Sequence, residues 1–143
     1  MTRMGICCDH AGYEMKELVV AHLRTRGIEC KDFGAYSEDR VDYPDYAHAL
    51  GTAIDRGEET YGIALCGSGN GISMALNKHS KVRAALCWSP ELAALARQHN
   101  DANVLSLPAR FLTEEEMKSI VDAFLEAAFE GGRHTPRVEK IPL

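Results

Sequence analysis

Residues 61–73 read YGIALCGSGNGIS, and this stretch decides the fold. Its first six residues form an apolar run of the length expected for a buried strand, and the next five include three glycines. Residues 70–78 then predict a helix that begins at the end of the glycine loop. A buried strand that turns through glycines into a helix is typical of α/β proteins with a parallel sheet.

The same alternation of apolar runs and helical patterns continues on both sides of this stretch. Further strands are predicted at residues 4–8, 28–33, 82–88 and 103–107. A polar loop, GAYSEDRVDYPDY, precedes a helix predicted at 45–56. Five strands alternating with helices predict a single-domain α/β fold over residues 1–143. We expect a doubly wound, Rossmann-like, five-stranded parallel sheet with helices on both faces.

The helix after the strand at 82–88 has a clear start. Ser89 is expected as its N-cap, and Pro90 occupies the first helical position. The spacing of Leu92, Leu95 and Ala96 predicts the buried stripe of this helix.

The last helix begins with a capping box formed by Thr113 and Glu116. Apolar residues at helical spacing follow, and Gly131 and Gly132 are expected to end the helix. Those apolar residues are Met117, Ile120, Val121, Phe124, Leu125 and Ala128. A basic tail at 131–143 remains, which is too short to form a domain.

Composition excludes several classes of protein. The chain has 16 Lys and Arg against 21 Asp and Glu, so a broad nucleic-acid surface is not expected. No apolar run approaches the roughly 18 residues of a membrane helix, so no membrane partner is expected. Asp9 and His10 come too early for a signal-peptide core. We therefore expect a cytoplasmic protein.

The five cysteines do not form a disulfide framework or a zinc ribbon. Their number is odd, and no C-x-x-C pair exists. Cys7, Cys8, Cys30 and Cys87 are expected to be small buried hydrophobes. Cys66 has two interpretations, because it ends a strand and faces the glycine loop. It is either another buried residue, or a thiolate base or nucleophile that a helix N-terminus favours.

The glycine loop at 66–73 does not match the common phosphate loops. A dinucleotide fingerprint would need glycine at position 72 or 74, where Ile72 and Met74 stand. A Walker loop is absent, and a C-x5-R phosphatase loop would need arginine at position 72. The loop is therefore interpreted as a site for an anion or oxyanion. The alternative is a tight turn between strand and helix.

Three polar segments are expected to meet at the carboxyl ends of the strands, where ligands bind in such sheets. They are Asp9-His10, the glycine loop, and His99-Asn100. Asp9-His10 could hold a sugar hydroxyl or a phosphate, and a metal is disfavoured there because no other ligand shows suitable spacing. His99 could equally be a structural histidine.

A cationic set stands out in the acidic chain. Arg133, His134 and Arg137 lie close together in the tail, and Arg110 could add to their charge. Arginine forks bind phosphate well. The alternative is a solvated tail.

Six motifs together resemble the family of type B ribose-5-phosphate isomerases, which also contains galactose-6-phosphate isomerase. They span nearly the whole chain in order, and the tail and the RQHND run are the most telling. The motifs are CDHAG (8–12), DYP (42–44), CGSGNGIS (66–73), NK (77–78), RQHNDANV (97–104) and EGGRHTPRV (130–138).

The resemblance implies a role for individual residues. Cys66 would move the proton between C1 and C2, His99 would open the furanose ring, and Asp9 could help to shuttle protons. Some members use a glutamate after the glycine loop instead, but Ser73 and Met74 stand there in this chain. The substrate-binding residues implied are Asp9, His10, Tyr43, Gly67, Ser68, Gly69, Asn70, Gly71, Asn100, Arg110, Arg133 and Arg137.

The resemblance also implies partners. A small phosphorylated sugar would be the substrate, with no cofactor and no metal. The family works as dimers or dimers of dimers with a pocket shared between subunits, so a monomer should be inactive. The expected reaction interconverts D-ribose 5-phosphate and D-ribulose 5-phosphate in the pentose phosphate pathway. A six-carbon sugar phosphate such as allose or galactose 6-phosphate, or a non-catalytic sugar-phosphate-binding module, are the alternatives.

Overall fold

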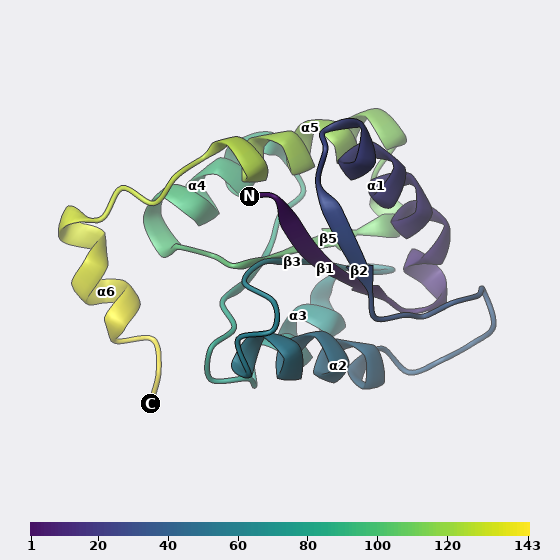
Figure 1. The fold of residues 1–143 in the computed structure, drawn as a ribbon, viewed down its shortest axis with the longest axis horizontal. Helices are drawn as coiled ribbons and strands as arrows, with labels where there is room; N and C mark the ends of the chain where they lie inside the picture. Colours follow the sequence, from purple (N-terminus) through teal and green to yellow (C-terminus); the bar gives the residue numbers. More distant parts are fainter.

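The computed structural model describes all 143 residues. Strands and helices alternate along the chain, with short 3-10 turns after β1 and β5 and before the last helix (Figure 1). The elements are β1 (Arg3–Cys8), η1 (His10–Gly12), α1 (Tyr13–Thr25), β2 (Glu29–Asp32), α2 (Tyr43–Asp55), β3 (Gly62–Cys66), α3 (Asn70–Leu76), β4 (Ala84–Leu86), α4 (Pro90–Asn100), β5 (Val104–Pro108), η2 (Ala109–Phe111), α5 (Glu114–Glu126), η3 (Gly132–His134) and α6 (Thr135–Glu139).

The five strands form one parallel sheet in the order β2-β1-β3-β5-β4. This confirms the predicted five-stranded parallel sheet. The chain leaves β1 toward β2 on one side and reaches β3 on the other, so the direction of winding reverses between β1 and β3. Crevices at such reversals are the usual ligand sites of open α/β sheets. The edge strand β4 is shorter than the predicted 82–88.

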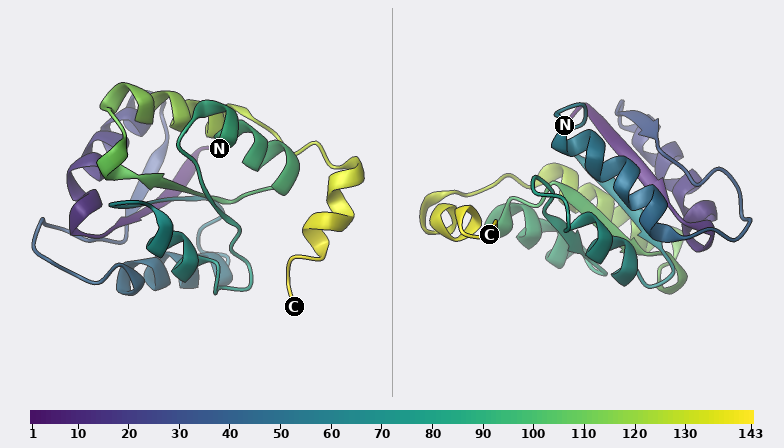
Figure 2. Two further views of the ribbon diagram at one scale, coloured as in Figure 1. Left: turned by 180° about the vertical axis from the view of Figure 1, so that it is seen from behind. Right: turned by 90° about the horizontal axis from the view of Figure 1, so that it is seen from below.

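Helices cover both faces of the sheet, as predicted. One face carries α1, α4 and α5, and the other carries α2 and α3 (Figures 1 and 2). Successive residues of β3 alternate between the two cores: Ile63 and Leu65 face the larger one, and Ala64 faces the smaller one beneath α2 and α3. No helix in the structure combines the length and the apolar character needed to cross a membrane.

Helix α2 begins earlier than predicted. It starts at Tyr43 and includes Pro44 in its first turn, although the sequence predicts Pro44 in the preceding loop. Proline fits the first turn of a helix because the N–H groups there have no partner within the helix. The earlier start puts Tyr43 at the edge of the sheet where α2 begins.

Helix α4 begins as predicted, since the Ser89 hydroxyl accepts from the Leu92 N–H at 3.3 Å. Its predicted buried stripe is wrong in part. Ala93, Ala96 and Arg97 are buried, whereas Leu92 and Leu95 are half-buried. The Arg97 side chain is accommodated because its Nη1 donates to Asp101 Oδ1 and to the backbone oxygen of Ala102.

Helix α5 has the predicted capping box between Thr113 and Glu116. The predicted end at Gly131 and Gly132 is wrong, because the helix ends at Glu126 and Ala127 already has extended backbone angles. Residues 127–131 lead away from the sheet to η3 and α6, which lie beside the main body (Figures 1 and 2). The basic tail is therefore partly helical.

Candidate active site

A pocket of about 490 Å³ lies at the carboxyl ends of the central strands. Four segments line it: the turn after β1, the start of α2, the glycine loop after β3 and the turn after β5. The lining residues are Asp9, His10, Ala11, Tyr43, Cys66, Gly67, Ser68, Gly71, Arg110 and Phe111. Most of the residues predicted around Cys66 are therefore brought together.

Main-chain hydrogen bonds join the turns that line this pocket. The Asp9 N–H donates to the backbone oxygen of Leu65 at 3.2 Å, and the Arg110 N–H donates to that of Gly67 at 3.0 Å. Parallel pairing also sets Cys66 opposite Pro108. The turns after β1 and β5 are therefore held against the end of β3.

Cys66 is the last residue of β3, and 5% of it is exposed. Its loop turns sharply at Gly69, where φ is 76° and a Cβ atom would lie 2.5 Å from Leu86 Cδ1. Only glycine suits such a position, because left-handed backbone and close contact both exclude a side chain. The turn lets the chain enter α3 at once, beside the Cys66 thiol.

The other cysteines lie outside the pocket, as free buried or half-buried thiols. Burial raises the pKa of Cys8 and Cys30 to about 11 and that of Cys87 to about 12. Burial also raises the pKa of Cys7 well above its usual value. These four thiols therefore stay protonated at neutral pH. Cys66 is the one cysteine that borders the pocket at the carboxyl ends of the central strands.

Asp9 and His10 supply polar atoms from the turn after β1. Asp9 Oδ1 accepts from the Gly12 N–H at 3.0 Å, and its second oxygen has no hydrogen bond within the chain. His10 Nδ1 lies 3.2 Å from both the backbone nitrogen and the backbone oxygen of Val41. This contact fixes the imidazole ring and leaves its Nε2 without a partner. The turn can therefore offer an acceptor and a ring nitrogen to a ligand.

Within the glycine loop, the predicted residues divide into two groups. Gly67, Ser68 and Gly71 line the pocket, but Gly69 and Asn70 do not. The amide of Asn70 donates to Ser68 Oγ at 3.2 Å, and Asn70 lines a neighbouring groove beside β4.

His99, Asn100, Arg133 and Arg137 lie away from this pocket. The expectation that His99 and Asn100 would meet the other segments at the carboxyl edge is wrong. Helix α4 runs antiparallel to the strands, so its last residues reach the amino edge of the sheet. There the chain enters β5 at Val104, four residues after Asn100. Within one chain they cannot share a ligand with Cys66.

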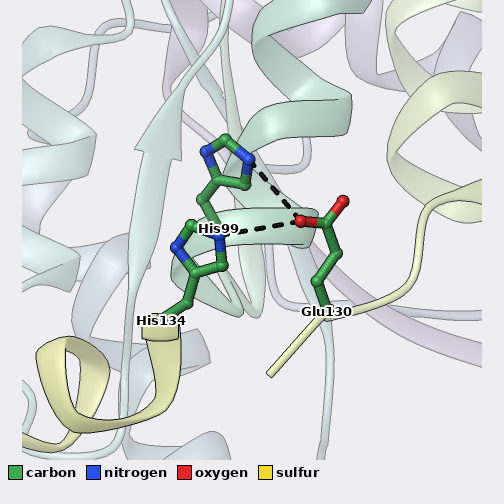
Figure 3. A group of neighbouring side chains, drawn as sticks. All are labelled: His99, Glu130 and His134. Atoms are coloured by element: carbon green, nitrogen blue, oxygen red, sulfur yellow. Dashed lines mark ion pairs between the residues drawn. The ribbon is translucent and has the colours of Figure 1, made fainter. Parts of the chain in front are cut away.

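Beside the end of α4, His99 meets two residues of the tail (Figure 3). His99 and His134 stack with ring centroids 4.3 Å apart and an interplanar angle of 14°. Glu130 Oε1 lies 3.8 Å from His99 Nε2 and 3.6 Å from His134 Nε2. Burial lowers the pKa of His134, and the neighbouring His99 and Arg133 lower it further.

Glu130, Ala11 and Phe111 were not singled out from the sequence. Glu130 stands four residues before His134, a spacing that could have drawn attention to it. His99 and Glu130 are 31 positions apart and give no such signal, because only the fold brings them together.

Comparison with known proteins places the chain in a family. A sequence model described as Ribose/Galactose Isomerase matches residues 4–141. The chain belongs to this family. Among its curated relatives, the ribose-5-phosphate isomerase B of Escherichia coli K12 is 48% identical over 141 residues, covering 99% of this chain and 95% of the relative.

Solved structures of the ribose/galactose isomerase family have the same fold. The ribose 5-phosphate isomerase of Thermotoga maritima has a TM-score of 0.96 at 48% identity, covering 99% of this chain and 97% of that one. Ribose-5-phosphate isomerase B of Mycoplasma genitalium, solved with bound ribulose-5-phosphate, has a TM-score of 0.92 at 44% identity, covering 97% and 93%. The predicted family and fold class are confirmed.

Proposed function

We propose that this chain is an aldose–ketose isomerase that interconverts D-ribose 5-phosphate and D-ribulose 5-phosphate through an enediolate. The observation that carries the proposal is the likeness, at 44% identity over 97% of the chain, to the Mycoplasma genitalium protein with bound ribulose-5-phosphate. The pocket supports this chemistry, because a thiol, a carboxylate and a glycine loop border it together.

Cys66 is the proposed base. The Cys66 thiolate removes the proton from C2 of the open-chain aldose, which gives the enediolate anion. The C1 oxygen then gains a proton, which gives the enediol. Return of the proton to C1, with loss of the proton from the C2 hydroxyl, gives the ketose. Backbone N–H groups of the glycine loop would donate to the developing oxyanion, and Asp9 would help to carry protons between the oxygens.

The remaining pocket residues are proposed to bind the sugar phosphate. Tyr43 would hold a sugar hydroxyl, and His10 and Arg110 would lie near the phosphate. A remote phosphate gives binding energy that can orient the reacting carbons.

A second copy of the chain would complete the site. Within one chain, four of the implied site residues lie too far from Cys66 to act on a sugar bound there. Another subunit would have to supply them: His99, Asn100, Arg133 and Arg137. We therefore include a homodimer, or a dimer of dimers, in the proposal. Phe111 lines the pocket and is 72% exposed in the single chain, where a partner subunit would cover it.

Subunit complementation tests the shared site. Cys66→Ala and His99→Asn chains would each be inactive toward ribose 5-phosphate when pure. In a mixed dimer one site would combine intact Cys66 with intact His99. A random equal mixture should therefore recover about a quarter of wild-type activity, since half of its dimers are mixed and each has one intact site. Activity no higher than that of the pure variants would contradict a shared site.

An assay of purified protein tests the reaction itself. We expect the highest kcat/KM for ribose 5-phosphate when it is compared with allose 6-phosphate and galactose 6-phosphate. The Cys66→Ala variant, purified in the same way, is the control for contaminating isomerases. A six-carbon preference would favour the alternative isomerase, and binding without turnover would favour a non-catalytic module.

A cytoplasmic location and a place in the pentose phosphate pathway belong to the same proposal. Both are supported by the substrate chemistry and by the five free thiols, which suit a reducing compartment.

A further inference from the structure

His99, Glu130 and His134 form a compact group of metal-ligating side chains outside the pocket of Cys66 (Figure 3). Their three ligand atoms lie within 4.8 Å of one another. Two imidazole nitrogens and one carboxylate oxygen are a ligand set that zinc uses in proteins.

The two separations that involve the Glu130 carboxylate are close to those of a tetrahedral site. Ligand bonds of about 2.0–2.1 Å place neighbouring ligand atoms about 3.4 Å apart. Glu130 Oε1 is 3.6 Å from His134 Nε2 and 3.8 Å from His99 Nε2. In Figure 3 dashed lines join both histidine nitrogens to the same carboxylate oxygen, so rotations of the side chains would bring all three to one ion.

His134 supplies an independent observation. Its residue is 6% exposed, and its Nε2 is buried without a hydrogen-bond partner. An unpartnered polar atom in a buried position is costly unless something binds it. This nitrogen faces the Glu130 carboxylate at a distance too long for a hydrogen bond, which leaves room for a bound ion.

The group is held by the fold at several points. His99 belongs to the last turn of α4, and the Glu130 N–H donates to the backbone oxygen of Gln98 at 3.0 Å. His134 ends the turn η3. The Glu130 side chain is 51% exposed, so water could reach a fourth ligand position. The positive charges of Arg133 and Arg137 act on His134 and would weaken cation binding.

We propose that His99, Glu130 and His134 bind a divalent transition-metal ion of the zinc class, with water as a further ligand. Binding does not depend on the proposed function. One consequence does rest on that function: an ion bound to His99 would keep this residue from opening the sugar ring, so the metal would inhibit the isomerase.

Titration of the metal-free protein with Co²⁺, followed by displacement with Zn²⁺, tests the site. Tetrahedral cobalt has an intense visible absorption, which reports binding without any assay of activity. We expect one such site per chain. Glu130→Gln and His134→Asn should each weaken binding by about tenfold or more, since even indirect partners of a metal contribute that much.

Matched variants control for changes unrelated to the site. Glu139→Gln removes a carboxylate from the same tail, and His48→Asn removes a histidine from α2; neither should change cobalt binding. Circular dichroism shows whether the variants remain folded. Because Glu130 is exposed, Glu130→Gln should not disturb the core.

Two results would overturn the proposal. One is no tetrahedral cobalt spectrum in the wild-type chain. The other is a tetrahedral spectrum that stays unchanged in both Glu130→Gln and His134→Asn. If that spectrum also contained a sulfur-to-cobalt band, the ion would be bound at a cysteine. Inhibition by Zn²⁺ that is relieved in Glu130→Gln would support the consequence for activity, and binding without inhibition would refute that consequence alone.

Discussion

The ring of Tyr43 fills the space in front of Gly71, where a Cβ atom would lie 2.5 Å from the ring's Cζ. Gly71 is in the first turn of α3, and Tyr43 begins α2. The absence of a side chain at position 71 therefore sets where this ring lies in the pocket.

Gly71→Ala should displace Tyr43 without unfolding the chain, because Tyr43 is 39% exposed and its ring can move. Loss of one hydrogen bond to the sugar, worth about 0.5–1.5 kcal/mol, would lower kcat/KM about twofold to tenfold. Kinetics of Gly71→Ala, Tyr43→Ala and the double variant check this. If the alanine acts through Tyr43, the double variant is no worse than Tyr43→Ala. Fully additive losses would show a separate effect on the loop.

Cys66→Ala should remove the base and leave substrate binding largely intact. We expect kcat to fall by about 10²-fold or more with little change in KM, as for loss of a general base. Cys87→Ala is the matched control, because Cys87 is also a buried thiol but lies outside the pocket. Near-normal turnover by Cys66→Ala would identify another group as the base.

His99→Asn should slow ring-closed substrates far more than an open-chain aldose. Ribose 5-phosphate closes a furanose ring, whereas erythrose 4-phosphate cannot, because its O4 carries the phosphate. Relative to wild type, we expect a loss of about 10²-fold or more for the first substrate and a much smaller loss for the second. His48→Asn should change neither rate. Equal losses for both would mean that His99 acts in proton transfer or in folding.

Arg133→Ala and Arg137→Ala test the proposed phosphate contact. Each charge-assisted hydrogen bond is worth about 1.5–3 kcal/mol, so kcat/KM for ribose 5-phosphate should fall about tenfold to a hundredfold. The poor rate with free ribose should barely change. Arg56→Ala, an exposed arginine on another surface, is the control. Equal losses with both sugars would show that these arginines hold the dimer or the tail.

Lys16→Met tests a buried ion pair beneath the turn that follows β2. Lys16 is fully buried, and its Nζ donates to both oxygens of Asp32 and to the backbone oxygen of Ala35. Removing the ammonium leaves these acceptors without their donor, so the free energy of unfolding should fall by about 2 kcal/mol. Urea unfolding measures the change. Lys31→Met is the control, because Lys31 is exposed and lies next to Asp32 in the sequence, and it should have little effect. An equal loss of unfolding free energy in both variants would exclude a special role for the buried ion pair.

Most of the sheet was predictable from the sequence, because its strands other than the polar β2 are apolar runs separated by glycines and capped helices. The N-cap of α4 and the capping box of α5 depend on residues close together in the sequence, so the local pattern was sufficient to predict them. The end of α5 was not predictable in this way. Ala127 and Ala128 suit a helix, but the chain leaves the helix at Ala127 and turns toward the tail.

The candidate site was predictable where it depends on strand ends and not where it depends on a helix end. Asp9 follows β1 and Cys66 ends the adjacent parallel strand β3, so their proximity follows from topology. His99 was placed on the same edge because its position in a helix was treated like a position after a strand. A helix that connects parallel strands runs back to their amino edge, and this direction separates His99 from Cys66 in one chain.

The turns around the pocket are joined by main-chain hydrogen bonds, from Asp9 to Leu65 and from Arg110 to Gly67. Such bonds do not depend on which side chains these positions carry. Substitutions at Arg110 or Phe111 would therefore reshape their side of the pocket, where the sugar phosphate is proposed to lie, while the carboxyl edges of the strands stay in place. A single scaffold of this kind can serve sugars of different length, with a change of preference requiring only a few exchanged side chains.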